Sequence, residues 1–133
     1  MRLWHYQLLP FIPRSQLLAQ WRELNSIYAK EDRHVLINYI YDYPKVDLLA
    51  YSDLVIEEMT KRGYKIRSFE KMNAYFEQTE RIEGFIPFLS HHQNEYLEIC
   101  YFNLKEKFLC GQKDFTKEQF EQIQKLYINS KSK

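Results

Sequence analysis

Glycine, proline and cysteine are scarce in this sequence, which holds three, four and two of them among 133 residues. Glycine and proline punctuate turns, so their scarcity predicts few turns and favours helices. The cysteines, Cys100 and Cys110, lie ten positions apart and lack the Cys-x-x-Cys spacing of zinc sites. We therefore interpret them as free thiols in a reducing cytosol.

Long hydrophobic runs are also missing, since no apolar stretch approaches the ~20 residues that span a bilayer. The N-terminus has a basic residue and several apolar ones, but Pro10 and Pro13 interrupt them and no small-residue cleavage site follows. A cytoplasmic protein with no membrane partner is expected.

A large charge of either sign is absent too, because the formal net charge is +1. Any nucleic-acid site must therefore be a local patch rather than a property of the whole molecule. The sequence has no glycine-rich phosphate loop and no G-x-S-x-G, which disfavours standard nucleotide-dependent chemistry. No pair of histidines has the i, i+4 spacing of a metal site, so neither a metal nor another cofactor is expected.

Residues that build a folded core are plentiful: 45% are hydrophobic and 28% charged, as in ordinary globular proteins. At 133 residues the chain is expected to form one domain, residues 1–133. The aromatic share is 17%, with 11 tyrosines, and some of these are expected to line a surface or groove.

Helical spacing is clearest after Pro13, which suits the start of a helix. From Ser15 onward the apolar residues recur on one helical face, namely Leu17, Trp21, Leu24 and Tyr28, with Leu18 and Ile27 at its edges. Arg22 and Glu23 fall off this face, on the side of Ala19, so both are expected to point outward beside small neighbours. A solvated helix face is sufficient to explain them.

Four further helices are predicted from start and stop signals. One covers 44–62 and ends at Gly63, and one covers 68–78 with Ser68 as its cap. Capping-box patterns at SHHQ (90–93) and TKEQ (116–119) predict the other two, with His91 and His92 in a first turn, facing solvent or substrate.

Segment 34–44 fits either a helix or a strand, and 85–89 reads as an apolar connector. The fold class is therefore all-α, a compact single-domain helical bundle with irregular connections.

The first residue offers a second kind of chemistry. An α-amino group has an ordinary pKa of ~7.7–8, so part of it is neutral and nucleophilic near pH 7. Arg2 would favour the neutral amine by like-charge repulsion, and a carboxylate across the site could exchange protons with it. Every protein has an N-terminus, so this pattern alone assigns no role.

Four segments occur in an informative order: MRLWH (1–5), LLAQWREL (17–24), HV (34–35) and DLVIEEMTKRGYKI (53–66). Together they resemble the pyrimidine-dimer DNA glycosylases of the phage endonuclease V type. The similarity continues weakly through FIP (85–87) and NLKEKF (103–108), so it covers most of the chain. The order and spacing of the segments carry the resemblance, not any single motif.

The resemblance implies an all-α DNA-repair enzyme that acts on damaged double-stranded DNA. In that family the N-terminal α-amine attacks deoxyribose C1′ next to a damaged pyrimidine, a Schiff base forms, and β-elimination cuts the strand. An essential glutamate lies on the first long helix, after an arginine. The resemblance assigns these roles to Met1, Glu23 and Arg22.

The same resemblance implies that Arg2 and Arg22 hold flanking phosphates, with help from Arg14. Trp4 and His5 are then expected to contact bases.

Several features depart from the family pattern. Arg2 is too bulky to permit removal of Met1, so methionine supplies the amine where the phage enzyme has threonine. Ser26 replaces a second arginine one turn after the glutamate. The ending YINSKSK lacks the aromatic segment that helps dimer recognition, and the low net charge predicts weaker non-specific DNA binding.

Two alternatives stay open. The chain could be a non-catalytic nucleic-acid- or protein-binding domain on the same scaffold, which forms no covalent intermediate. It could also be a lyase for another aldehyde-bearing substrate, such as abasic sites in RNA. The oligomeric state is not specified by the sequence, and a monomer is favoured.

Overall fold

Prolines mark the starts of the two longest helices. In the structure, a computed structural model that describes residues 2–132, Pro13 precedes α1 (Arg14–Lys30) and Pro44 precedes α2 (Lys45–Lys61). A proline at this point costs no helical hydrogen bond, because the first N–H groups of a helix have no partner within it. Gly63 follows α2 with a φ of +83°, a left-handed conformation that glycine adopts without strain.

Three further α-helices follow in the chain: α3 (Glu70–Tyr75), α4 (Asn94–Leu109) and α5 (Lys117–Lys131). Two 3₁₀ helices, η1 (Tyr6–Leu8) and η2 (Asn38–Asp42), lie in the connections. Residues 2–132 contain no β-strand, so the prediction of an all-α fold is confirmed. The ambiguous segment 34–44 contains η2 and is otherwise irregular.

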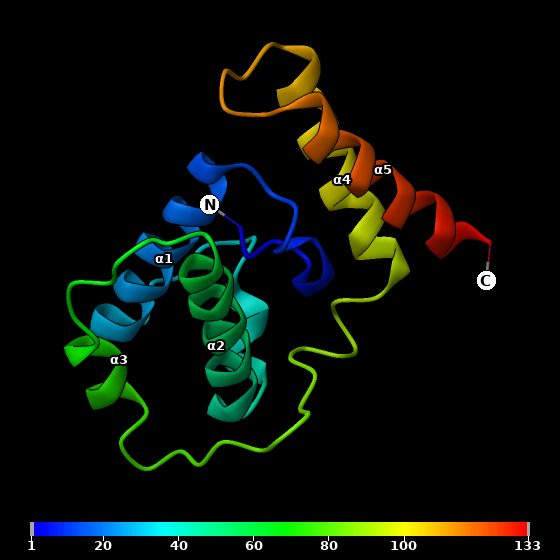
Figure 1. The fold of residues 1–133 in the computed structure, drawn as a ribbon. Helices are drawn as coiled ribbons and strands as arrows, with labels where there is room; N and C mark the ends of the chain where they lie inside the picture. The colour runs from blue at the N-terminus through cyan, green and yellow to red at the C-terminus, as the bar shows by residue number, and fades with distance from the viewer. Residues whose placement is uncertain (1, 133) are drawn as a thin grey trace.

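The helices form two groups with the N-terminal segment between them (Figure 1). Helix α1 packs against α2 and α3, and α4 packs against α5 as an antiparallel pair. One hydrophobic core joins both groups, with fully buried side chains from the N-terminal segment, α1, α2 and α4: Leu3, Leu17, Tyr51 and Leu97. The start of the chain is therefore an internal part of the fold.

The capping box predicted at residues 116–119 is confirmed. Thr116 Oγ1 accepts a hydrogen bond from the Gln119 N–H, and the Gln119 side chain accepts one from the Thr116 N–H. These reciprocal bonds satisfy two donors that the first turn leaves free.

The capping box predicted at residues 90–93 is wrong. Helix α4 begins only at Asn94 and has no side-chain cap. The chain turns earlier because the Phe88 N–H donates to the buried Asp47 carboxylate and Phe88 takes a φ of +52°. His91 and His92 therefore precede α4, and His92 is 3% exposed rather than facing solvent.

Helix α3 is shorter than the predicted range 68–78. Ser68 Oγ accepts a hydrogen bond from the Glu70 N–H at 3.1 Å, as a residue at a helix start does. The helix stops before Phe76, whose buried ring packs edge-on against Tyr28 of α1. Tertiary packing thus ends α3 where the sequence has no stop signal.

No helix between residues 2 and 132 is long and apolar enough to cross a membrane. Over the same residues, no three His, Cys, Asp or Glu side chains lie together as metal ligands. Cys100 and Cys110 are free thiols, the first buried and the second exposed.

Candidate active site

A buried glutamine fixes the backbone at the start of the chain. Gln20 of α1 is 2% exposed. Its Nε2 donates to the carbonyl oxygen of Arg2 at 3.0 Å, and its Oε1 accepts from the N–H of Trp4 at 2.9 Å. A single side chain therefore satisfies two backbone groups of a segment that has no regular structure of its own.

Two tyrosines hold the same segment from other helices. The Tyr51 hydroxyl of α2 donates to the Trp4 carbonyl oxygen at 2.7 Å, and the Tyr96 hydroxyl of α4 donates to the Leu3 carbonyl oxygen at 2.5 Å. Tyr51 is fully buried and Tyr96 nearly so. Three helices thus set the path of three consecutive residues, 2–4, next to the chain's first residue.

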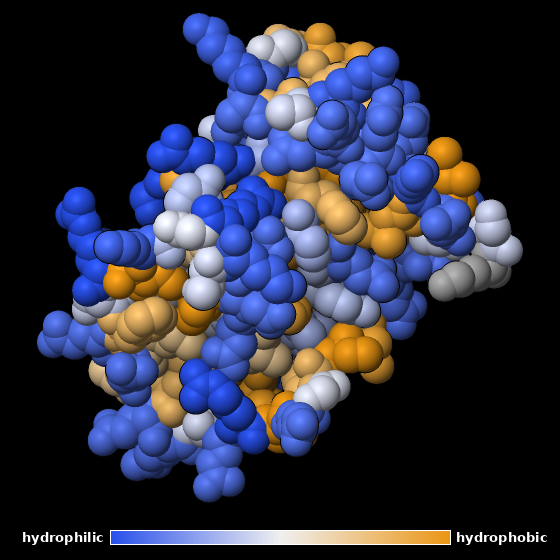
Figure 2. Space-filling model, in the orientation of Figure 1, coloured by the Kyte–Doolittle hydropathy of each residue, from blue (hydrophilic) through white to orange (hydrophobic). Residues whose placement is uncertain are grey.

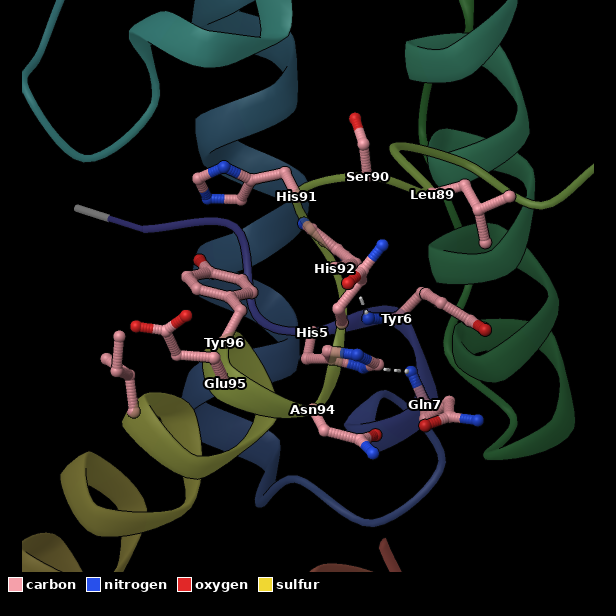
Figure 3. Close-up of a pocket in the computed structure, with 12 residues that line it drawn as sticks. His5, Tyr6, Gln7, Leu89, Ser90, His91, His92, Asn94, Glu95 and Tyr96 are labelled. Carbon is pink, nitrogen blue, oxygen red and sulfur yellow. Dashed lines mark hydrogen bonds between the residues drawn. The ribbon is translucent and has the colours of Figure 1, made fainter. Parts of the chain in front are cut away.

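Two neutral histidines continue this arrangement along residues 5–7 (Figure 3). His92 Nδ1 accepts from the Tyr6 N–H at 3.2 Å, which places its proton on Nε2, 2.7 Å from the Tyr39 hydroxyl. His5 Nδ1 accepts from the Gln7 N–H at 3.2 Å. Burial lowers the pKa of His5 to about 4 and holds that of His92 well below its ordinary value. At neutral pH both rings therefore serve as hydrogen-bond partners without charge.

A cavity of about 280 Å³ opens beside the fixed segment. Ala19 lines it with a methyl group alone, which leaves room where a larger residue of α1 would fill the space. The cavity brings Arg2 and Glu23 together from separate parts of the chain. Its other lining residues come from the N-terminal segment, α1, the following loop and α4: Trp4, Gln16, Gln20, Leu36, Asn103 and Lys107.

Glu23 has incomplete hydrogen bonding in this cavity. Its Oε1 is buried and has no hydrogen-bond partner among residues 2–132. Burial is the largest cause acting on the Glu23 carboxyl and raises its pKa above the ordinary value. Titratable groups perturbed in this way cluster at functional sites.

Arg2 brings a positive charge to the same region. Its guanidinium carbon lies 5.8 Å from the ring centre of Trp4 and 5.8 Å from that of Tyr96. Both rings offer their electron-rich faces to the cation. The chain's second residue therefore places a guanidinium next to the cavity that contains Glu23.

Arg22 lies on a different side of α1 from the Glu23 carboxylate. Arg22 is exposed, as expected, whereas Glu23 turns partly inward. Arg14 and Arg22 line a neighbouring groove and take no part in the 280 Å³ cavity. Consecutive residues of a helix point about 100° apart, which accounts for this divergence.

The remaining candidate residues differ in their accessibility. The rings of Trp4 and His5 are 8% and 2% exposed, which leaves little surface on which a base could stack. Trp4 borders the Glu23 cavity, and His5 borders a larger cavity of about 670 Å³ (Figure 3). Their predicted base contacts stay predictions. Met1 lies outside the described residues.

Sequence reasoning missed the residues that hold the N-terminal segment. Gln20 stands in a helix whose other buried positions are mostly apolar, and an isolated glutamine has no motif to mark it. Tyr51 and Tyr96 are two among 11 tyrosines. A buried polar residue on an apolar helical face was the one available signal, because such a group requires partners.

The fold and cavity define a small all-α protein in which residues 2–4 are held beside a partly buried carboxylate, that of Glu23. The family model described as "Pyrimidine dimer DNA glycosylase" matches residues 1–72. The chain belongs to this family, and the suspected resemblance is confirmed. No curated protein and no solved structure matches the chain.

The matched residues contain α1, α2 and the first half of α3, together with Arg2, Gln20, Glu23 and Tyr51. Helices α4 and α5 lie beyond the match, although α4 contributes Asn103 and Lys107 to the cavity. Membership therefore rests on the half of the chain that carries most of the candidate site.

Proposed function

We propose that this protein is a DNA-repair glycosylase with abasic-site lyase activity, acting at pyrimidine dimers or other damaged sites in double-stranded DNA. The α-amine of Met1 is the nucleophile and Glu23 the acid/base group. The observation that carries this proposal is the common cavity of Arg2 and Glu23, since Arg2 is covalently adjacent to Met1. The fixed path of residues 2–4 supplies the positioning that such a nucleophile requires.

The proposed glycosylase step exchanges one C–N bond for another. The amine lone pair forms a bond to C1′ while the glycosidic bond breaks, and the base leaves with that electron pair and gains a proton. The amine nitrogen then loses a proton, the sugar ring opens as O4′ gains one, and C1′=N forms. Removal of a proton from C2′ expels the 3′ phosphate oxygen with its bonding electrons, which cuts the strand.

Glu23 fits the proton transfers in this sequence. Its Oε1, which has no hydrogen-bond partner among residues 2–132, can accept a proton from the attacking amine and return one to O4′. Its raised pKa brings it closer to neutrality, where both directions of transfer are accessible. As a carboxylate it also stabilises the positive charge that develops at C1′. None of these steps uses a metal ion.

Arg2, Arg22 and Arg14 are the proposed phosphate contacts. A guanidinium binds phosphate oxygens through parallel N–H donors, and these bonds are stronger than those between neutral groups. Ser26 Oγ donates instead to the Asp32 carboxylate, so the position where the phage enzyme has an arginine is used within the protein.

The test is strand cleavage with reductive trapping, using protein that carries no tag at its N-terminus. Duplexes with one pyrimidine dimer or one abasic site are incubated with the protein, with and without borohydride. Cleavage and a covalent adduct are expected, and Glu23→Gln should reduce both by about 10²–10⁴-fold. Glu57→Gln is the matched control, since Glu57 is exposed on α2 with an ion pair to Lys61.

Each result assigns one of the candidate functions. An adduct on abasic DNA without cleavage at dimers limits the activity to a lyase. Faster trapping on abasic RNA than on abasic DNA would identify abasic RNA as the preferred substrate. Tight DNA binding with no adduct on any duplex would overturn the proposed enzymatic activity. That result would support the non-catalytic binding domain.

A further inference from the structure

A long groove lies on the other side of α1 from the Glu23 cavity. It has a volume of about 840 Å³ and runs between α1, the end of α2, the connector after α2 and the start of α3. Its apolar residues are Leu18, Trp21, Met59 and Ile66. On the face shown in Figure 2, hydrophilic side chains project around α1 and α3 with apolar surface between them.

The cations of this groove are unusually concentrated. Its lining includes five cationic side chains and one carboxylate, that of Glu70. The local charge is therefore +4, against +1 for the whole chain, so the rest of the protein carries −3. All five cationic residues are exposed: Arg14, Arg22, Lys65, Arg67 and Lys71.

None of these five cations forms an ion pair within residues 2–132. Close by on α2, by contrast, Lys61 pairs with Glu57 and Arg62 pairs with Glu58. Five cations beside a single carboxylate repel one another, and an anionic partner reduces that repulsion. The groove therefore has the charge of a site for a polyanion.

The surface between the groove and the cavity suits a broad partner. On a helix of 3.6 residues per turn, Ser15, Ala19 and Arg22 fall on one strip between the two. All three are exposed, and two of them have small side chains. A partner that lies across this strip can contact the groove and the Glu23 cavity at the same time.

We propose that the groove binds the sugar–phosphate backbone of the DNA duplex next to the damaged site, with Lys65, Arg67 and Lys71 as further phosphate contacts. This inference rests on the proposed function and extends it to a surface formed by the connector and α3. The duplex crosses the exposed strip of α1, so that one strand reaches the cavity while the backbone beyond it lies in the groove. The low net charge of the chain thus conceals a concentrated DNA-binding surface.

The test is equilibrium binding of a fluorescein-labelled, undamaged DNA duplex as a function of salt. The variant Lys65→Gln/Arg67→Gln/Lys71→Gln removes three cations of the groove. The matched control Lys105→Gln/Lys117→Gln/Lys125→Gln removes three cations of α4 and α5, which lie away from α3 (Figure 1). Each lost phosphate contact lowers the slope of log K against log salt by about 1.

The groove variant is expected to lose about 2–3 in slope and roughly 10–100-fold in affinity at low salt, while the control keeps the slope of the unmodified protein. Lys65→Arg/Lys71→Arg, which preserves the charge, should also keep it. Equal slopes for the groove variant and the unmodified protein would overturn the inference. Polyglutamate that competes for the protein as tightly as DNA does would also overturn it, and would identify the groove as a site for acidic polypeptides. Undamaged DNA requires no chemistry, so this result is independent of borohydride trapping.

Discussion

At the scale of single residues, Glu23 combines an unfavourable environment with a proposed chemical role. Its folded pKa lies above the ordinary value of 4.5, so the folded state holds the proton more tightly than the unfolded state does. Stability therefore falls as the pH rises through this interval, and the ionised carboxylate destabilises the fold at pH 7. Residues selected for activity commonly carry such a cost.

Glu23→Gln should accordingly stabilise the protein while removing its activity. We expect Tm to rise by roughly 2–4 °C at pH 7, because the partly buried charge of Glu23 is gone. Well below pH 4.5 the gain should vanish, since Glu23 is then protonated in both states. Calorimetry at pH 7 and at low pH measures the difference, with Glu57→Gln as control. A lower Tm at pH 7 would contradict the assigned environment of Glu23.

Tyr51 tests whether the hydrogen bonds to the N-terminal segment position the nucleophile. Tyr51→Phe removes the donor to the Trp4 carbonyl oxygen and leaves that acceptor buried. We expect a loss of about 1–2 kcal/mol in the free energy of unfolding. The trapping rate should fall by about 10-fold or more at saturating DNA, because the amine is less well oriented. If Tyr51→Phe lowers the stability but leaves the trapping rate unchanged, the role of Tyr51 is purely structural.

At the scale of elements, the sequence predicted helix ends well where a local signal marks them. Pro44, Gly63 and the Thr116 capping box all act as their residue types predict. The capping box predicted at residues 90–93 is wrong because the preceding turn depends on Asp47, 41 residues from Phe88, which no local pattern contains. Helix α3 is shorter than predicted for a similar reason, because the packing of Phe76 against Tyr28 of α1 is a tertiary contact.

Helix α5 offers a separable test of stability. Thr116→Ala removes one half of its capping box and should cost about 1 kcal/mol in the free energy of unfolding. Because α5 lines neither the Glu23 cavity nor the basic groove, the trapping rate should stay unchanged at temperatures where the protein is folded. Chemical denaturation and trapping of the same sample check both statements. A fall in rate without unfolding would connect α5 to the site.

The N-terminal segment should make the fold sensitive to acid. The folded pKa of His5 is lowered from 6.5 to about 4 by burial, so only the unfolded state binds a proton between these values. The stability that the neutral ring provides is complete above pH 6.5 and is lost as the pH falls towards 4.

His5→Asn keeps an acceptor near the Gln7 N–H but does not titrate in this range. We expect its Tm to depend less on pH between 6.5 and 4 than that of the unmodified protein. The exposed His34→Asn serves as the control and should keep the original dependence. Identical pH profiles for all three proteins would exclude His5 as a source of the acid sensitivity.

At the scale of the whole molecule, the N-terminal segment connects the two groups of helices. Tyr96 reaches Leu3 across 93 positions of sequence, and His92 reaches Tyr6 across 86. Contacts at such separations have no signature in a single sequence. The resemblance named Arg2 and Glu23, but the reason that they share a cavity, a chain start held from three helices, became visible only in the fold.

Charge shows the same contrast between the whole chain and one surface. The net charge of +1 excluded a basic protein, and the prediction of a local patch followed from it. Which cations gather could not be predicted, because Arg14 and Arg22 meet Lys65, Arg67 and Lys71 only when α1 packs beside α3. The arrangement of helices therefore creates the proposed DNA surface from an almost neutral sequence.

The most direct test of the central claim is to locate the borohydride-reduced adduct on the chain. Untagged protein is trapped on abasic duplex DNA, digested and mapped by mass spectrometry, beside protein whose α-amine has been acetylated. We predict an adduct on the Met1 amine and none from the acetylated protein. An adduct on Lys107, the lysine that lines the Glu23 cavity, or equal trapping after acetylation, would contradict the assignment of the α-amine as the nucleophile.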